Sequence, residues 1–534
     1  MSVAEVSVEG KSSGMWQGGN KEMTRLKTKA HWTRPYWYWF GQGRLGSGLV
    51  WLAVAGALVS GLLLRIWMLG RFPQSVDGDS MVYGTLAKNL LVHGQFALTD
   101  GSGVLHATLI RLPGYPLLLA LIFSLFGVGN YAAVAVVQII VDLASCLLLA
   151  DFVRLATGRL LPALITLWLA ALCPFTAIYA GAPLTETPTL FTIALALWST
   201  IRFIQTPTAR LGRRSGWNSR WSYALLFAAA VSAAAMLRPD GALVAFALAP
   251  ALLLGAGRAA ERSSWRRLAT MATVCTVLAL LPFAVWTLRN WRALHVIQPL
   301  APRYATDPGE DLFPGWQRWV KTWCLDFVST EQVYWNVPDG VLNPQQLPDR
   351  AFDSAAQQQE TVALVEEYNQ MQQLTPELDA RFAHLAEERV RAHPLRFYLG
   401  LPLGRVADMW LRPRVENMPI ESDWWDFERH QEETRLCWAY VGLNLFYLVL
   451  GVAGLFLRPR LWLAMLAYFL LRSALLATIE APEARYTLEC FPMLFILGGV
   501  ALSHGLYWFQ LRTVDGRQRA LTANAAAQDS ARPD

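Results

Sequence analysis

The chain has 534 residues, of which 54% are hydrophobic and only 16% are charged. Soluble domains carry about 25% charged residues, so this composition excludes an ordinary soluble protein and indicates a membrane protein. The net charge of +6 does not indicate a nucleic-acid partner, because the basic residues form short clusters between apolar runs instead of one stripe. The six cysteines show no zinc or redox spacing, and we assign them no chemistry.

The chain begins with a polar and basic arm, residues 1–45, which we expect to be disordered and cytoplasmic. It contains seven Lys and Arg residues, and positive residues favour the cytoplasmic side of the first membrane span. The apolar run that follows is too long for the core of a cleaved signal peptide. We therefore expect this run to remain as a membrane anchor.

Ten apolar runs are long enough, at roughly 17 to 25 residues, to cross a membrane as helices. They lie near residues 47–69, 131–153, 160–180, 183–204, 221–237, 241–257, 268–288, 437–457, 461–479 and 487–509. Two further apolar pieces are excluded: 117–127 is too short to span, and 394–411 contains Arg396, Arg405 and Asp408. With ten spans, both chain ends and the basic short loops fall on the cytoplasmic side. The sequence therefore predicts an all-α polytopic membrane bundle with interfacial helices in the first outer loop.

This topology divides the rest of the chain into four parts. They are a membrane domain at 46–288 with an outer loop at 70–130, a periplasmic domain at 289–436, C-terminal spans at 437–511 and a disordered cytoplasmic tail at 512–534. The domain at 289–436 holds 23 of the chain's 40 acidic residues and shows no repeat or known binding motif. We expect it to be mainly helical, with a helical stretch from about residue 355 to 392.

In the outer loop at 70–130, two carboxylates one residue apart, Asp77 and Asp79, precede an amphipathic helical pattern. The helix dipole stabilises an anion at this position, and a fixed carboxylate can take a proton from a hydroxyl or hold a divalent cation. The alternative is that Asp-Gly-Asp forms an ordinary turn and helix cap.

Two further acids lie in or beside the predicted spans. Glu186 is at the outer start of the fourth span, where a carboxylate close to hydrocarbon indicates a function. The alternative for Glu186 is a role at the helix start, with Pro188 just inside. Asp142 follows Gln138 by four residues on one helix face, and we interpret it as a partner in an interhelical hydrogen bond.

Four arginines lie at outer ends of spans or in outer loops, against the positive-inside bias: Arg111, Arg238, Arg289 and Arg485. A guanidinium matches a phosphate in a bidentate way, so a phosphate is a natural partner for such a group of arginines. For any single arginine, the alternatives are snorkelling to the interface or pairing with Asp240, Glu480 or Glu483.

The order of these motifs resembles the GT-C glycosyltransferases, in particular bacterial members similar to dolichyl-phosphate-mannose protein mannosyltransferases and the lipid A aminoarabinose transferase. The resemblance covers roughly residues 48–300 and 437–509. It rests on an acid after the first span with Tyr83 four residues beyond Asp79, Arg-x-Pro-Gly-Tyr-Pro from Arg111, Glu186, Arg-Pro-x-Gly at Arg238, Arg-Asn at Arg289, and Arg-Tyr at 485–486.

The resemblance implies an inverting transfer of a sugar from a polyprenyl-phosphate donor to an acceptor hydroxyl, at the periplasmic face of a bacterial inner membrane. It places the catalytic carboxylate at Asp79, with Asp77 as the fallback. The implied donor-phosphate residues are Arg485, Arg111 and Arg289, and the implied substrate-binding residues are Glu186, Tyr83, Tyr115, Arg238 and Tyr486. The resemblance leaves open whether a divalent cation, Mg²⁺ or Mn²⁺, binds at Asp77, Asp79 or Glu186. The implied partners are the donor, membrane lipid, and a glycan, lipid or protein acceptor, with no nucleic acid.

Two other classes of function use the same features differently. A membrane transporter or lipid flippase could use the intramembrane acids as a proton pathway, although transporters often show internal repeats and we find none. A non-catalytic scaffold could use the domain at 289–436 to recruit cell-wall enzymes, and Asp79 would then be dispensable.

Overall fold

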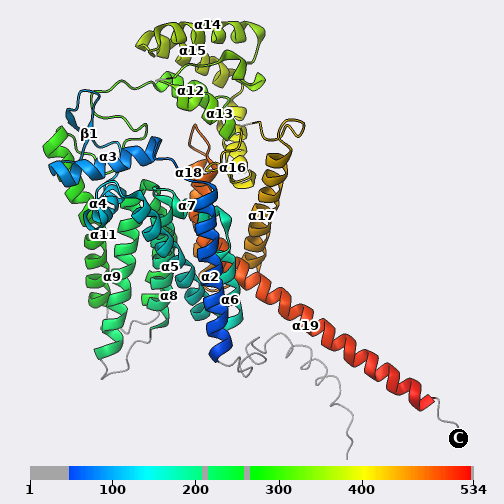
Figure 1. The fold of residues 1–534 in the computed structure, drawn as a ribbon. Helices are drawn as coiled ribbons and strands as arrows, with labels where there is room; N and C mark the ends of the chain where they lie inside the picture. Colours follow the sequence, from blue (N-terminus) through cyan, green and yellow to red (C-terminus); the bar gives the residue numbers. More distant parts are fainter. Residues whose placement is uncertain (1–46, 207–213, 258–264, 339, 422, 531–534) are drawn as a thin grey trace, which may run out of the picture. The chain divides into compact units, whose positions relative to one another are not determined.

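The computed structural model describes residues 47–206, 214–257, 265–338, 340–421 and 423–530. The predicted basic arm at 1–45 lies outside the described residues. The chain forms two units, one ending at Leu52 and one beginning at Ala53, and the second unit carries the features that follow. Over the described ranges, the strands are one antiparallel pair, β1 (Ala97–Thr99) and β2 (Leu105–Ala107). The chain is therefore an all-α, multi-pass membrane protein, as predicted (Figure 1).

Each of the ten predicted spans contains an α-helix in the described residues. Within the part of the chain that the structure describes, seven helices are long and apolar enough to cross a membrane: α2 (Ser47–Arg71), α5 (Tyr131–Thr157), α8 (Glu186–Gln205), α9 (Arg214–Leu237), α11 (Trp265–Leu294), α17 (Gln431–Phe456) and α19 (Phe491–Ser530). An eighth span is the pair α6 (Leu160–Ala171) and α7 (Pro174–Gly181), which is bent by 52° at its break. Pro174 stands at the start of α7, where a proline cannot continue the hydrogen bonding of α6.

The two remaining predicted spans are shorter than expected. Helices α10 (Leu243–Gly257) and α18 (Trp462–Leu476) have 15 residues each, which corresponds to about 23 Å of helix against a hydrocarbon core of about 30 Å. Seven or eight helices in the described residues therefore have the length of a span, instead of the ten that hydropathy predicted. The run predicted for α10 included Gly241 and Ala242, which belong to the 3-10 helix η1 (Pro239–Ala242), and the run predicted for α18 included residues 477–479 beyond the helix end.

Short helices occupy the first outer loop. Helix α3 (Gly78–His93) begins directly after the first span, and α4 (Gly114–Phe126) is a 13-residue helix that is too short to cross a bilayer. Gly114 allows α4 to approach α9 closely, because a Cβ at this position would lie 2.4 Å from the Met236 carbonyl oxygen. This close approach brings the start of α4 next to the outer end of α9.

The region between α11 and α17 contains α12 (Pro314–Lys321), α13 (Phe327–Gln332), α14 (Ala355–Met371), α15 (Pro376–Ala392) and α16 (Leu401–Leu411). The expected single helical stretch at 355–392 is two helices, separated by a turn in which Gln372 has a φ of 50°. Helices α12, α14 and α15 share a core around three tryptophans, Trp316, Trp319 and Trp323, each at most 1% exposed. This core is distinct from the core of the membrane helices.

The membrane core lies among α5, α6, α8, α9 and α19, which contact one another in sequence-distant pairs such as α19 with α6 (Figure 1). Within it, Asp142 on α5 accepts a hydrogen bond from Nε of Arg65 on α2 at 2.7 Å, so the predicted interhelical hydrogen bond is confirmed. At the C-terminus, α19 continues to Ser530, whereas the sequence predicts a disordered tail from residue 512. The alanines in this segment favour a helix, which explains the difference.

Candidate active site

The first outer loop directs its two carboxylates to different partners. Asp77 precedes α3 with an extended backbone, and its carboxylate accepts a hydrogen bond from Ser75 Oγ at 2.6 Å in an exposed position. Gly78 follows with a φ of +44°, a backbone conformation that glycine adopts at little cost. Asp79 then lies in the first turn of α3, where the helix dipole favours a negative charge.

Asp79 lies between two arginines from distant parts of the chain. Its Oδ1 accepts a hydrogen bond from Arg111 Nη2 at 2.6 Å, and its Oδ2 accepts one from Arg485 Nη2 at 3.3 Å. Arg485 is 406 residues away in sequence, so the predicted meeting of the first outer loop with the start of the last span is confirmed. Burial alone would raise the pKa of Asp79, but the charges of Arg485 and Arg111 outweigh it and lower the pKa below its ordinary value. Asp79 is therefore ionised at neutral pH.

Arg485 is held by a second carboxylate, Glu483. The Nε of Arg485 lies 2.5 Å from Glu483 Oε2, and the hydroxyl of Tyr486 donates a hydrogen bond to Glu483 Oε1. The guanidinium therefore bridges Asp79 and Glu483, with side-chain exposures of 19%, 29% and 4% for the three groups. This partly exposed bridge gives the site two carboxylates and two guanidiniums.

Next to it lies a more deeply buried ionic network around Arg238. Arg238 Nη1 is 3.0 Å from Glu186 Oε1, and its Nε is 3.3 Å from Asp240 Oδ1 and 3.1 Å from Glu489 Oε1. Arg472, on α18, contacts Asp240 at 2.6 Å and Glu489 at 2.7 Å. Glu186 Oε2 is buried and receives no hydrogen bond from any residue in the described ranges. Three carboxylates and two arginines leave this network one negative charge in excess when all five are ionised.

Three tyrosines lie near the two groups of charges. The ring of Tyr486 is 5.5 Å from the Arg238 guanidinium and 5.6 Å from that of Arg485, so it lies between the networks. Tyr83 packs edge-on against Tyr115, with ring centroids 5.1 Å apart. Burial and then the charge of Asp79 raise the pKa of Tyr83 to about 12, so its phenol is neutral at pH 7.

Tyr115 is fixed in turn by α5. Its hydroxyl donates to Gln138 Oε1 at 2.9 Å, and the Gln138 amide donates to the Ala182 carbonyl oxygen at 2.5 Å, just before α8. The side chain of Tyr115 is fully buried. Its hydroxyl thus positions α4 against the bundle, and its ring supports Tyr83.

Arg289 does not join this group of residues. Its guanidinium donates to the carbonyl oxygens of Thr108, at 2.7 Å, and Phe96, and it stacks on the rings of Phe96 and Trp286. These contacts attach α11 to the β1–β2 segment of the first outer loop. No contact described for Arg289 joins it to Arg485 or Arg111, and its role toward the donor phosphate stays a prediction.

The predicted cation ligands do not converge either. Both oxygens of Asp79 face arginines, Asp77 is turned to Ser75, and Glu186 belongs to the Arg238 network. Among the described residues, no three His, Cys, Asp or Glu side chains form a group that could hold a metal ion. The residues present fit an anion between Arg111 and Arg485 better than a divalent cation.

Reasoning from the sequence missed Arg472 and Glu489, and it treated Asp240 and Glu483 only as possible arginine partners. Arg472 interrupts the apolar run Tyr-Phe-Leu-Leu-Arg-Ser-Ala-Leu-Leu, and Glu489 lies within the last span. An ionisable residue inside a membrane segment is a functional signal in its own right. Such ionisable residues are visible in the sequence, but the sequence does not indicate which acid pairs with which arginine.

The fold and this site define a class: a helical membrane protein with an ionised carboxylate clamped by two arginines at the outer-loop end of its spans. Residues 111–286 match the sequence model of the dolichyl-phosphate-mannose-protein mannosyltransferase family. This stretch contains Arg111, Tyr115, Glu186 and Arg238. The chain is therefore similar to GT-C glycosyltransferases of the protein mannosyltransferase type, which confirms the resemblance inferred from its motifs. The search of curated proteins found no match to this chain.

Three solved structures resemble this fold at low identity. The Saccharomyces cerevisiae protein O-mannosyltransferase Pmt1-Pmt2 complex bound to the sugar donor is 18% identical, with a TM-score of 0.35, over 46% of this chain and 34% of that chain. The Archaeoglobus fulgidus oligosaccharyltransferase in the apo form is 13% identical, with a TM-score of 0.46, over 89% and 52%. ArnT from Cupriavidus metallidurans in the apo state is 16% identical, with a TM-score of 0.34, over 86% and 77%. The chain thus spans about a third to a half of the length of the first two structures. The activities of those proteins are therefore considered for this chain only as a proposal.

Proposed function

We propose that this protein is an inverting glycosyltransferase that moves a sugar from a polyprenyl-phosphate donor to an acceptor hydroxyl, at the periplasmic face of a bacterial inner membrane. The observation that carries the proposal is the contact of Asp79 with Arg111 at 2.6 Å and with Arg485 at 3.3 Å. A carboxylate can accept the acceptor's proton, and guanidiniums beside it can stabilise a leaving phosphate. These are the two demands of such a transfer.

In the proposed reaction, the acceptor oxygen attacks the anomeric carbon while its proton passes to Asp79. The bond between the anomeric carbon and the phosphate oxygen breaks on the opposite side, and the phosphate leaves with the electron pair. Attack from the side opposite to the leaving group inverts the configuration at that carbon. The leaving phosphate gains negative charge in the transition state, and preorganised guanidiniums stabilise that charge.

The arginine contacts have a second consequence for Asp79. Before the donor binds, Arg485 and Arg111 lower the pKa of Asp79, which makes it a weak base. A donor phosphate competes for the same guanidinium hydrogens, so Asp79 shares its partners with an anion once the donor is bound. Its affinity for a proton then rises. Donor binding would thus activate the base, which limits proton abstraction to the loaded enzyme.

Arg111 and Arg485 both contact Asp79, and their two positive charges can neutralise a phosphate at this position without a divalent cation. We therefore expect transfer by the purified protein to proceed at an unchanged rate in EDTA. A rate that falls in EDTA and returns with Mg²⁺ or Mn²⁺ would contradict this part of the proposal.

The direct test is reconstitution of the full chain in lipid bilayers with radiolabelled polyprenyl-phosphate sugars and membrane or envelope fractions as acceptors. Transfer is scored as label that leaves the lipid donor and appears in an acceptor glycan, lipid or protein, identified by mass spectrometry. Uptake or flipping of the lipid without any transfer would instead support the transporter class. Among the intramembrane acids such a pathway would use, Asp142 is already paired with Arg65.

A further inference from the structure

Two adjoining cavities lie between α13, the end of α16 and the segment that follows α16. The larger has a volume of about 340 Å³ and the smaller about 60 Å³, and both have Val328 and Arg412 in their walls. Ligand pockets usually begin at about 300 Å³, and the smaller space holds roughly four to six water molecules. We call the two cavities together the Trp424–Trp425 groove, because Trp424 lines the smaller and Trp425 the larger.

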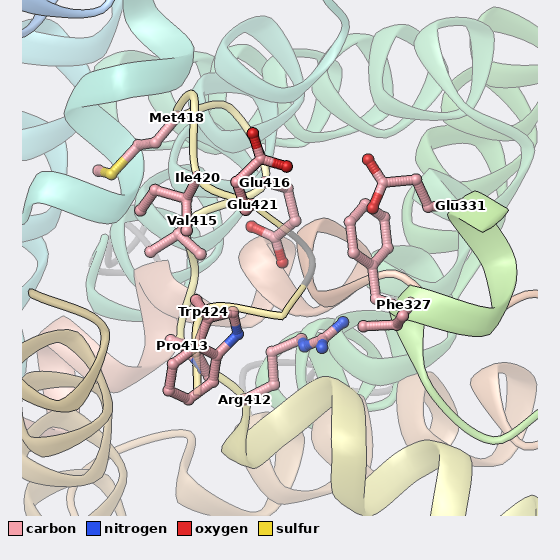
Figure 2. Close-up of a pocket in the computed structure, with 11 residues that line it drawn as sticks. Phe327, Glu331, Arg412, Pro413, Val415, Glu416, Met418, Ile420, Glu421 and Trp424 are labelled. Carbon is pink, nitrogen blue, oxygen red and sulfur yellow. The ribbon is translucent and has the colours of Figure 1, made fainter. Parts of the chain in front are cut away.

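The groove contains buried polar atoms that lack partners within the protein. Asp408 Oδ2, Arg412 Nη1 and Glu416 Oε1 are each buried and have no hydrogen-bond partner among the described residues. All three residues line the groove (Figure 2 shows Arg412 and Glu416 at the smaller cavity). Buried donors and acceptors are almost always satisfied in native proteins. Hydroxyl groups in the groove would satisfy both the carboxylates and the guanidinium.

Aromatic surfaces accompany these polar groups. The rings of Trp424 and Trp425 lie 6.0 Å apart at 78° to each other, and Trp425 is 55% exposed. A sugar ring has C–H groups on its faces, which pack on an aromatic ring, and hydroxyls around its edge, which bond to planar polar side chains. Gln332 and Gln346 add such side chains to the larger cavity. The lining therefore suits carbohydrate better than a purely apolar lipid chain.

The charge of the groove restricts the class of ligand further. Five carboxylates and two guanidiniums line the two cavities, and one of those guanidiniums, on Arg350, is already paired with Asp326 at 2.6 Å. An anionic ligand such as a phosphorylated headgroup would meet an excess of negative charge. A neutral or amino-bearing glycan would not.

The groove adjoins the proposed active site through a single segment of chain. Asn417 accepts a hydrogen bond from Gln74 of the first outer loop at 3.2 Å, through its carbonyl oxygen. Arg414 donates to the carbonyl oxygen of Ala484 at 2.7 Å, immediately before Arg485. Residues 412–421 in the wall of the smaller cavity thus belong to the segment that contacts Gln74 in the first outer loop and Ala484 beside Arg485.

We propose that the Trp424–Trp425 groove is the acceptor-binding site and that the acceptor is a neutral or amino-bearing glycan chain. This inference rests on the proposed glycosyl transfer, since it names the class of molecule that receives the sugar. The larger cavity holds one sugar unit of the chain against Trp425. The smaller cavity directs the next unit toward the segment that carries Arg485.

The test measures glycan binding and transfer separately on the full-length protein in lipid nanodiscs. The binding probes are defined neutral and amino-containing oligosaccharides, measured by biolayer interferometry. The variants are Trp424→Ala/Trp425→Ala and, as a matched control, Trp265→Ala, an exposed tryptophan at the start of α11. We expect the double variant to bind the recognised oligosaccharide about tenfold more weakly or worse, as loss of aromatic anchors usually does, while the control and Asp79→Asn bind as the wild type does.

In the transfer assay, the double variant should raise the acceptor KM by about the same factor and leave the donor KM unchanged. Unchanged glycan binding in a folded double variant would overturn the inference, and so would wild-type protein that transfers sugar only to peptides or to lipid vesicles. Glycan binding that depends on the two tryptophans, with no sugar transfer under any condition, would refute the proposed glycosyl transfer and the acceptor role together, leaving a glycan-binding groove. Sugar transfer that is unchanged in the double variant would refute only the acceptor role of the groove.

Discussion

Asp79→Asn and Asp77→Asn form a matched pair, because the same substitution is made two residues apart in one loop. Asp79 contacts two guanidiniums, whereas the hydrogen bond described for the Asp77 side chain comes from Ser75 Oγ in an exposed position. If Asp79 is the base, losing it removes general base catalysis, which contributes about 100- to 10,000-fold, or roughly 3 to 5 kcal/mol of transition-state free energy. Asp77→Asn should change the rate by no more than about twofold, as exposed substitutions usually do.

The structure also predicts how the loss divides between binding and chemistry. Asparagine keeps the shape of the side chain and can still accept one hydrogen bond from Arg111, while Arg485 keeps Glu483 at 2.5 Å. Removing the negative charge takes away the anion that competes with the donor phosphate for both guanidiniums. We therefore expect kcat to fall while donor affinity stays the same or improves. The ion pairs of Asp79 are partly exposed, so the free energy of unfolding should fall by only about 1 to 2 kcal/mol.

The assay is single-turnover transfer from a radiolabelled polyprenyl-phosphate sugar, with donor binding measured on the same preparation. Thermal unfolding in detergent confirms that both variants are folded. The reasoning is refuted if Asp79→Asn retains more than about a tenth of the wild-type rate, or if Asp77→Asn loses as much activity as Asp79→Asn. Loss of donor binding in Asp79→Asn would show that this carboxylate acts on the donor instead of the acceptor.

Three further predictions follow from the same contacts. Arg485→Ala should reduce kcat by about 100- to 1,000-fold, because the stabilisation of the leaving phosphate is lost. Arg485→Lys should retain more activity, because only the bidentate contact is lost. Arg303→Ala is the control, since Arg303 is an outer arginine paired with Glu480 at 2.5 Å and should have little effect on kcat; equal losses at Arg485 and Arg303 would contradict this prediction. Because the folded-state pKa of Asp79 is lowered, its ion pairs contribute their full stability above the unfolded pKa of about 4 and lose it as pH falls through the folded pKa. In the pH–rate profile of kcat/KM, activity should therefore fall only below about pH 4. In the profile of kcat, activity should already fall at higher pH, because the bound donor phosphate shares the two arginines with Asp79. If both profiles fall at the same pH, activation of the base by donor binding is ruled out. Arg65→Met should destabilise the protein by about 3 to 5 kcal/mol because it leaves Asp142 buried without its partner, and Arg65→Met/Asp142→Leu should recover most of this in thermal unfolding; a double variant no better than the single would show that packing, not charge, makes Arg65 necessary.

The sequence by itself determined the all-helical membrane architecture, because hydropathy is a local property summed along each run. It also identified Asp79, Arg111 and Arg485, since an acid after the first span and arginines against the positive-inside bias are each visible without any contact. It overestimated two spans, α10 and α18, because hydropathy does not distinguish a 15-residue α-helix from the short 3-10 helix or the turn residues beside it.

Only the tertiary structure decided which charges meet. Asp77 and Asp79 have the same chemistry and almost the same position, and the turn at Gly78 gives only Asp79 contact with the arginines. Arg289 carries the same signal as Arg485, yet its donors go to backbone carbonyl oxygens of the first outer loop. Arg472 and Glu489 form a network with Arg238 that no spacing predicts. The physical reason is that an ion pair depends on distances of about 3 to 4 Å, and those distances are set by the packing of helices whose residues lie hundreds of positions apart in the chain.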